Sequence, residues 1–142
     1  MSKDLHTARQ LLSQGTFTCV LCREDAVYTS TRRGVAPLMA WLEEGLDLAG
    51  FSAADKVVGK ATALLYCLLG VKAVYAGVIS RAALGVFQAR HMPCSYGELV
   101  PAIRNRTGDG LCPMESATLE IDDPALAPDA IRAALKRLTA GK

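Results

Sequence analysis

The chain has 142 residues, and its 16 Lys and Arg against 14 Asp and Glu give a formal net charge of +2. This length suits one domain with its own core, and an apolar share of 51% argues against disorder. The even charge balance and an aromatic content of 6% disfavour a nucleic-acid-binding protein. No apolar run is long enough for a membrane span and the N-terminus has no signal-peptide pattern, so we expect a cytoplasmic protein. Five irregularly spaced cysteines are expected to be reduced.

The first part of the sequence predicts a helix, a β-hairpin and a short second helix. Ser2 is a favourable N-cap, and apolar residues recur at helical spacing as far as Gly15. Two strands, 17–22 and 26–30, are separated by a polar turn. Pro37 then begins a short helix that ends before a glycine.

The second part of the sequence alternates helices and strands. Residues 55–60 are interpreted as a connection that leads into an almost wholly apolar helix, which we expect to be buried. The elements predicted from there are helix 61–69, strand 71–79, helix 81–90, strand 95–100, a short helix from Pro113 and an amphipathic helix at 129–138. This order predicts an α/β protein, a three-layer αβα sandwich with a mixed sheet, formed by one domain over residues 1–142. A C-terminal helix at about 124–140 is expected as an addition to it.

Three motifs of this sequence occur in the same order in a known family. They are Val58-Gly59-Lys60-Ala61-Thr62-Ala63-Leu64-Leu65, Tyr75-Ala76-Gly77-Val78-Ile79-Ser80, and Asn105-Arg106 followed by Cys112-Pro113-Met114-Glu115. Together they resemble an uncharacterised prokaryotic family of hypothetical proteins whose fold is similar to that of cytidine deaminases. The resemblance covers roughly residues 5–120 and implies a deaminase-like fold more than an activity.

The resemblance also indicates where the zinc ligands of a deaminase would stand. Zinc deaminases carry His/Cys-x-Glu and Pro-Cys-x-x-Cys at the starts of two successive helices. The matching positions are Gly59-Lys60-Ala61 and Ser80-Arg81-Ala82-Ala83, which offer no zinc ligand. Cys22-Arg23-Glu24 and Pro93-Cys94 match fragments of these motifs, but the first lies at a hairpin and Gly97 stands where the last ligand belongs. We therefore predict no metal and no cofactor, and a zinc-dependent deaminase is the least favoured function.

The segment 105–115 has the composition of a functional loop, with glycines, acids, an arginine and a cysteine within eleven residues. Cys112 directly before Pro113 is expected at a helix start, where a thiolate is stabilised. Glu115 is a candidate acid/base, so Cys112 and Glu115 are the candidate catalytic residues. The alternative is a capping box in which Glu115 binds back to the backbone N–H of Cys112.

Two helix starts form a candidate anion site. Gly59 lets backbone N–H groups approach an anion and Lys60 adds a positive charge. The alternative is a glycine packed on the sheet and a lysine that reaches solvent. Ser80 and Arg81 begin the next helix, although Ser80 also reads as a plain N-cap. Together with Asn105 and Arg106 in the loop, these residues are the predicted ligand-binding set.

The sequence leaves two main functional hypotheses and does not decide whether the protein is an enzyme. The first is a protein that binds a small anionic or nucleotide-like molecule in a deaminase-like pocket without zinc, with thiol or acid/base chemistry at Cys112 and Glu115 as an option. The alternative is a non-catalytic regulatory or protein-interaction module. A homo-oligomer is expected from the apolar composition, and neither a membrane nor a nucleic acid is an expected partner. The pair Cys19 and Cys22 is interpreted as structural, because positions i and i+3 of a strand face opposite sides.

Overall fold

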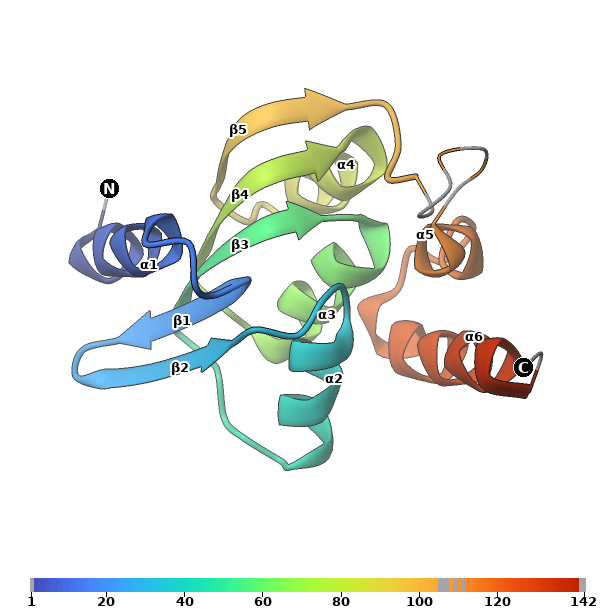
Figure 1. Cartoon of the computed structure of the whole chain (residues 1–142), viewed down its shortest axis with the longest axis horizontal. Coiled ribbons are helices and arrows are strands. Elements are labelled where there is room, and N and C mark those ends of the chain that lie inside the picture. Colours follow the sequence, from blue (N-terminus) through green and yellow to red (C-terminus); the bar gives the residue numbers. More distant parts are fainter. Residues whose placement is uncertain (1, 105–107, 109, 111, 141–142) are drawn as a thin grey trace.

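The computed structural model of the chain describes residues 2–104, 108, 110 and 112–140. It is built on a five-stranded mixed sheet in the order β2-β1-β3-β4-β5, with helices on both faces (Figure 1). The elements are α1 (Lys3–Ser13), β1 (Cys19–Arg23), β2 (Ala26–Ser30), α2 (Ala36–Glu43), β3 (Ser52–Val58), α3 (Lys60–Leu69), β4 (Ala73–Ser80), α4 (Arg81–Ala89), β5 (Cys94–Val100), α5 (Pro113–Ala117), the 3-10 helix η1 (Pro124–Leu126) and α6 (Ala127–Ala140). The predicted α/β class with a mixed sheet between helices is confirmed.

The sheet has an antiparallel half and a parallel half. β1 pairs antiparallel with both β2 and β3, whereas β3, β4 and β5 run parallel to one another. The parallel strands are connected through α3 and α4, as short βαβ connections require. The carboxyl ends of β3, β4 and β5 therefore meet at one edge of the sheet.

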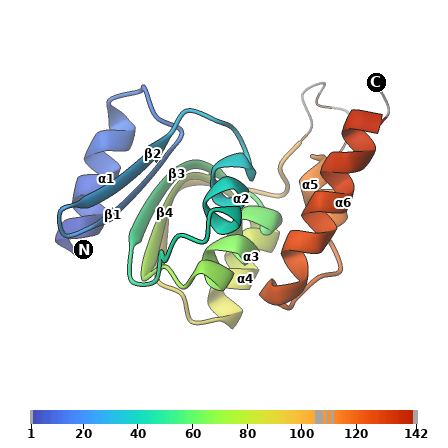
Figure 2. The ribbon, with the colours of Figure 1, turned by 90° about the horizontal axis from the view of Figure 1, so that it is seen from below.

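The helices are unequally distributed over the two faces. α1 lies on one face, where Ala8 and Leu12 pack on Val20, Cys22 and Ala54. α2, α3 and α4 lie on the other face and enclose the main hydrophobic core (Figure 2). α5 and α6 lie outside α3 and form a further layer beyond it (Figure 2). None of the helices in the described ranges combines the length and apolar character needed to cross a bilayer.

β3 was missed by the sequence prediction, which interpreted residues 55–60 as a connection. It is the middle strand of the sheet and pairs with both β1 and β4. Its sequence, SAADKVV, places an acid and a lysine in the middle of the strand, and Asp and Lys are both poor strand formers. The strand forms because its neighbours on both sides bury it, which outweighs its weak intrinsic preference.

The parallel half of the sheet contains two glycines that leave no room for a side chain. A Cβ atom on Gly77 would lie 2.8 Å from the carbonyl oxygen of Lys56 on β3. A Cβ atom on Gly97 would likewise lie 2.9 Å from the carbonyl oxygen of Gly77. Because both neighbours are backbone atoms of a sheet, neither can move away cheaply. Glycine at these two positions therefore fixes the close approach of β3, β4 and β5.

Candidate functional site

Two helices begin side by side at the carboxyl end of the sheet. α3 follows β3 after the N-cap residue Gly59, and α4 follows β4 after the N-cap residue Ser80. Val58 and Ile79, which precede these caps, are partners in the parallel pair of β3 and β4. In open α/β sheets this edge is where ligands usually bind. A ligand bound at this edge would face the starts of α3 and α4.

The N-terminus of α3 is occupied by a carboxylate of the protein itself. The backbone N–H of Lys60 donates a hydrogen bond to Oε1 of Glu115, and Glu115 is only 5% exposed. A Cβ atom on Gly59 would lie 2.7 Å from that oxygen, so the absence of a side chain lets the carboxylate approach. A negative charge at this position is stabilised by the helix dipole. Glu115 thus caps α3 from a segment far away in the sequence.

This arrangement differs from the capping box considered from the sequence. There, Glu115 would bind back to the backbone N–H of Cys112 at the start of its own helix. That N–H instead donates to the carbonyl oxygen of Ile103 at 2.9 Å, and Glu115 reaches across to α3. The capping-box alternative was therefore wrong, because Glu115 stabilises a neighbouring helix.

The side chain of Lys60 lies under the segment that follows α5. Its Nζ donates to the carbonyl oxygen of Leu119 at 2.8 Å and lies 3.4 Å from Oδ1 of Asp122. The Lys60 side chain is 9% exposed, whereas that of Asp122 is 95% exposed. The alternative in which Lys60 reaches solvent was therefore wrong. A largely desolvated ammonium group here faces one solvent-exposed carboxylate.

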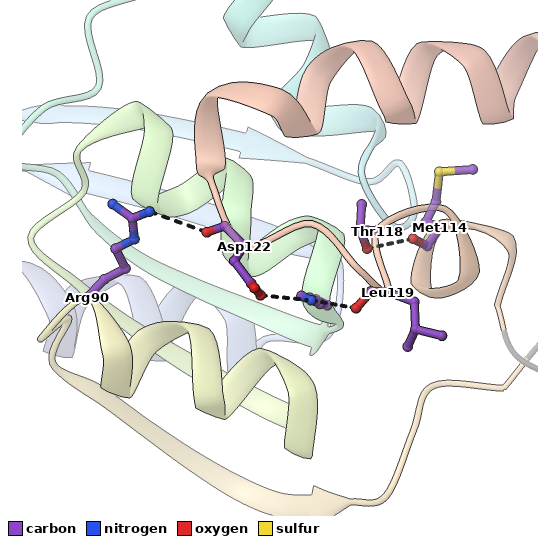
Figure 3. Close-up of polar contacts among 6 residues, drawn as sticks. Arg90, Met114, Thr118, Leu119 and Asp122 are labelled. Atoms are coloured by element: carbon purple, nitrogen blue, oxygen red, sulfur yellow. Dashed lines mark hydrogen bonds and ion pairs between the residues drawn. The ribbon is translucent and has the colours of Figure 1, made fainter.

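Arg90, at the end of α4, contacts the same segment from the other side. Its guanidinium NH2 group donates to the backbone carbonyl oxygen of Asp122 at 3.3 Å (Figure 3). Lys60 thus contacts the side chain of Asp122, and Arg90 contacts its backbone. Two cations from different elements are brought together at Asp122.

A cavity of about 260 Å³ lies between these two cations, along the outer side of α4. We call it the α4 groove, and its lining residues are Lys60, Ala82, Gly85, Val86, Ala89, Arg90 and Asp122. A Cβ atom on Gly85 would meet no described atom within 4 Å, so this part of the groove is unfilled. A second cavity, of about 310 Å³, lies between α5 and α6 and is lined by Pro113, Ser116, Ala117, Ala134, Arg137 and Leu138.

The other residues predicted to bind a ligand lie in different surroundings. Ser80 is fully buried and its Oγ accepts the backbone N–H of Ala83 at 3.1 Å, as a plain N-cap does. Arg81 is exposed and is absent from the described lining of both cavities. Asn105 and Arg106 lie outside the described residues, so their predicted role stays a prediction.

The cysteines do not assemble into a site in the described part of the chain. Cys112 is the half-buried N-cap of α5 and is absent from the described lining of both cavities, so it is not placed in the α4 groove with Lys60. Cys19 and Cys22 are buried in hydrophobic clusters on opposite faces of the sheet, as expected for positions i and i+3 of a strand. No group of three His, Cys, Asp or Glu side chains within the described ranges is arranged to hold a metal ion.

Sequence reasoning missed Arg90 and Asp122. Arg90 follows a helix and Asp122 lies in a polar connection, and both positions are typical of ordinary solvated charges. The three charged residues of the α4 groove come from three separate segments, so no sequence spacing relates them. Only the way in which the chain folds back over α3 and α4 brings them together.

Comparison with known proteins identifies the family. The model of the TM1506 family, a domain of unknown function (DUF1893), matches residues 7–135. The crystal structure of a DUF1893 family protein (TM1506) from Thermotoga maritima superposes with a TM-score of 0.82 at 27% sequence identity, covering 96% of this chain and 92% of that one. No curated protein matches this sequence. The chain therefore belongs to the DUF1893 (TM1506) family, whose function is unknown.

Proposed function

We propose that this protein binds a small anionic or nucleotide-like ligand in the α4 groove, in the cytoplasm and without zinc. The observation that carries the proposal is the meeting of Lys60 and Arg90 at Asp122, beside an unfilled cavity of about 260 Å³. A cavity of this size is close to the lower end of small-molecule sites in proteins. It suits a compact ligand.

The charges favour an anion. Lys60 and Arg90 contribute two positive charges and Asp122 contributes one negative charge. The pair between Lys60 and the exposed Asp122 is long, at 3.4 Å, and pairs of this kind contribute little stability. A carboxylate or phosphate of a ligand would replace Asp122 beside the desolvated Lys60. Arginine adds a planar donor pair that suits either group.

The floor of the groove suits an apolar or flat part of the same ligand. Ala82 and Ala89 present methyl groups along one side of α4, Gly85 presents bare backbone, and Val86 completes this apolar lining. A ring or a short aliphatic chain would cover this surface while its charged group binds at Asp122. The ligand proposed here is therefore a small organic anion.

We also propose that the fold is cytidine-deaminase-like. The strand order β2-β1-β3-β4-β5 and the helices that start directly after β3 and β4 support this relationship. The positions that carry zinc ligands in deaminases correspond to Gly59-Lys60-Ala61 and Ser80-Arg81-Ala82-Ala83. At the first of these positions the backbone N–H of Lys60 binds the carboxylate of Glu115, and at the second the buried Ser80 caps α4. This supports binding in place of zinc-dependent hydrolysis.

The geometry supports binding more strongly than catalysis. Glu115 is engaged by the backbone of Lys60, and the described lining of the α4 groove does not include Cys112. Thiol or acid/base chemistry at these two residues is thus the weaker part of the hypothesis. The predicted anion site at Gly59 would require that Glu115 be displaced.

Calorimetric titration tests the proposal. Inorganic phosphate, acetate, AMP and UMP are titrated into the natural protein and into three variants. Gly85→Leu fills the groove and Arg90→Gln removes one cation, whereas Arg81→Gln is the matched control outside the described groove. The proposal predicts saturable binding of at least one anion that Gly85→Leu and Arg90→Gln weaken at least tenfold and Arg81→Gln preserves. Binding that is absent for all four anions, or equal in all variants, contradicts it.

A second candidate function is a non-catalytic interaction module that forms a homo-oligomer. Two exposed leucines favour it: Leu119, which follows α5, and Leu126, which ends η1, are 56% and 59% exposed. Sedimentation equilibrium of the natural protein and of Leu126→Glu tests this candidate. A dimer that dissociates in the variant supports it, and a monomer at all concentrations excludes it.

A further inference from the structure

Three polar side chains are buried together in the core, away from the α4 groove. The hydroxyl of Tyr66 on α3 donates a hydrogen bond to Oδ2 of Asp55 on β3 at 2.7 Å. The Sγ atom of Cys19 on β1 lies 3.2 Å from the same hydroxyl oxygen. Cys19 and Asp55 are also direct partners across the antiparallel pair of β1 and β3. The cluster thus joins three elements of the core through one carboxyl group.

Asp55 is almost inaccessible to solvent and has no described cation beside it. It is 7% exposed, and its second oxygen, Oδ1, accepts the backbone N–H of Val57 at 3.4 Å. The described groups that act on it are Tyr66, Cys19 and the backbone N–H groups of Lys56 and Val57. The ammonium group of Lys56 is directed to the carbonyl oxygen of Gly15, at 3.4 Å. An ionised Asp55 would therefore be a buried charge without a counter-ion, which is unfavourable.

Among the described residues, the groups that act on Asp55 include no cation of β4 or α3. On β4, the partner of Asp55 is the apolar residue Ala76. Burial raises the pKa of Asp55 to about 7, although the hydrogen bond from Tyr66 opposes this rise. Burial also raises the pKa values of Cys19 and Tyr66 well above their ordinary values, so these two groups keep their protons. Asp55 is the member of the cluster that titrates near neutral pH.

We propose that Asp55, Tyr66 and Cys19 form a proton-dependent switch in which β1, β3 and α3 are fully packed while Asp55 is neutral, and loosen when Asp55 releases its proton. The step is a proton transfer from the carboxyl group to solvent, without any covalent change. The proposal rests on the three-element cluster and does not depend on ligand binding in the α4 groove.

The direction of the effect follows from proton linkage. The folded-state pKa of Asp55, about 7, lies above its ordinary value of 3.8. The neutral form of Asp55 therefore contributes its full stabilisation at pH values below the ordinary pKa. This contribution is lost as the pH rises through the folded-state pKa. Within this range the ratio of folded to unfolded protein falls by up to about tenfold per pH unit. Above the range the loss is complete and constant.

Urea unfolding between pH 5 and pH 9 tests the switch. The natural protein is compared with Asp55→Asn, which keeps the shape without the charge, and with Asp25→Asn, the matched control in the exposed hairpin turn. We expect the unfolding constants of the natural protein and of Asp25→Asn to rise with pH. In Asp55→Asn this rise should be smaller by about tenfold for each pH unit from 5 to 7. Identical pH dependence in Asp55→Asn and the natural protein overturns the proposal.

Infrared spectroscopy of the natural protein gives a second test that does not require Asp55→Asn to fold. At pH 6, carboxyl groups with ordinary pKa values are ionised, so a C=O stretching band of a protonated carboxyl reports a group such as Asp55. We expect this band at pH 6 and its loss by pH 8.5. Its absence at pH 6 overturns the proposal.

Discussion

Glu115 accepts the backbone N–H of Lys60 and thereby closes the N-terminus of α3 with a charge from within the protein. The side chain of the same lysine binds Leu119 and Asp122, a few residues after Glu115. Lys60 therefore holds the segment around α5 at two points, through its backbone and through its ammonium group. The helix start that would suit a bound anion serves to anchor the chain, and the anion site that we propose lies in the α4 groove instead.

The contact between Gly59 and Glu115 predicts a large effect of one added methyl group. In Gly59→Ala the new Cβ would lie 2.7 Å from Oε1 and 3.2 Å from Cδ of Glu115, so the carboxylate must move. The backbone at Gly59, with φ −95° and ψ −179°, is one that alanine adopts without strain. We expect a loss of about 1–3 kcal/mol in the free energy of unfolding, measured in urea, from the lost buried hydrogen bond. When Gly59→Ala is introduced into the Glu115→Ala variant, it should cost far less stability, since both substitutions act on the same contact.

Gly85→Ala is the matched control for this experiment. Gly59 is the N-cap of α3, and Gly85 lies within the neighbouring helix α4. Unlike a Cβ on Gly59, a Cβ on Gly85 would meet no described atom within 4 Å. Alanine at this interior helix position should stabilise the protein by about 0.5–1 kcal/mol. A loss of stability in Gly85→Ala comparable to that in Gly59→Ala would contradict the steric account of both positions.

The close approach of the parallel strands gives a second prediction. In Gly77→Ala the methyl group would overlap the carbonyl oxygen of Lys56, a backbone atom within the sheet. We expect a loss of about 1–3 kcal/mol in stability, in the range of other overpacked core positions, seen as a lower midpoint of thermal unfolding. An unchanged midpoint would show that the strands separate more easily than this geometry implies.

Much of the fold was predictable from local pattern, whereas the site was not. The apolar period of residues 3–13, the hairpin turn between β1 and β2, and the apolar sequence of α3 each indicate their element directly. β3 carries no such signal, because Asp55 and Lys56 interrupt its apolar pattern and its burial comes from β1 and β4. Strands that depend on their neighbours in this way are hard to identify from one sequence.

For the candidate site, the sequence indicated Lys60 but not its surroundings. Gly59 and Lys60 did mark a helix start at the edge of the sheet, yet the group beside them is Glu115 and not an external anion. Arg90 and Asp122 had no pattern that set them apart from solvated charges. Contacts between residues about 30 to 60 positions apart depend on the path of the chain, which local spacing does not encode.

Tyr66→Phe should move the pH dependence of stability upward. The hydrogen bond from the Tyr66 hydroxyl lowers the pKa of Asp55, so its removal raises that pKa further above 7. The loss of stability that begins near the ordinary pKa of Asp55 should then extend to higher pH than in the natural protein. Urea unfolding at pH 6, 7, 8 and 9 measures the shift. A shift of the midpoint toward lower pH would contradict the assigned role of the hydroxyl.

Alkylation of the cysteines, read by peptide mass spectrometry, separates burial from activation. Cys19 and Cys22 are buried, so they should react only after unfolding, whereas the half-buried Cys67, Cys94 and Cys112 react in the native protein. Burial raises the pKa values of Cys67 and Cys94, so alkylation of Cys112 that stays rapid well below pH 8, where an ordinary free thiol is slow, is the result that would support the predicted activated thiol. Equal alkylation rates at Cys67, Cys94 and Cys112 would contradict the predicted activation of Cys112. Native reactivity of Cys19 equal to that of Cys112 would contradict the described core.

Asp122→Asn tests whether Asp122 competes with the ligand. Its carboxylate lies 3.4 Å from Nζ of Lys60 and would repel an anion that enters the α4 groove. Because the Asp122 carboxylate is solvated and 3.4 Å away, its interaction with Lys60 is worth about 0–1 kcal/mol, so anion affinity should rise by up to about fivefold. Weaker anion binding in the variant would instead indicate that the ligand is a cation or that Asp122 holds it directly.

The most direct test of the central claim is a titration of the 15N-labelled protein with phosphate and with AMP, followed by NMR. If the α4 groove binds a small anion, the amide signals of Gly85, Arg90 and Asp122 shift saturably with one of these ligands, and Gly85→Leu abolishes the shifts. Saturable shifts that survive Gly85→Leu, or the absence of any saturable shift at these residues, would contradict the account.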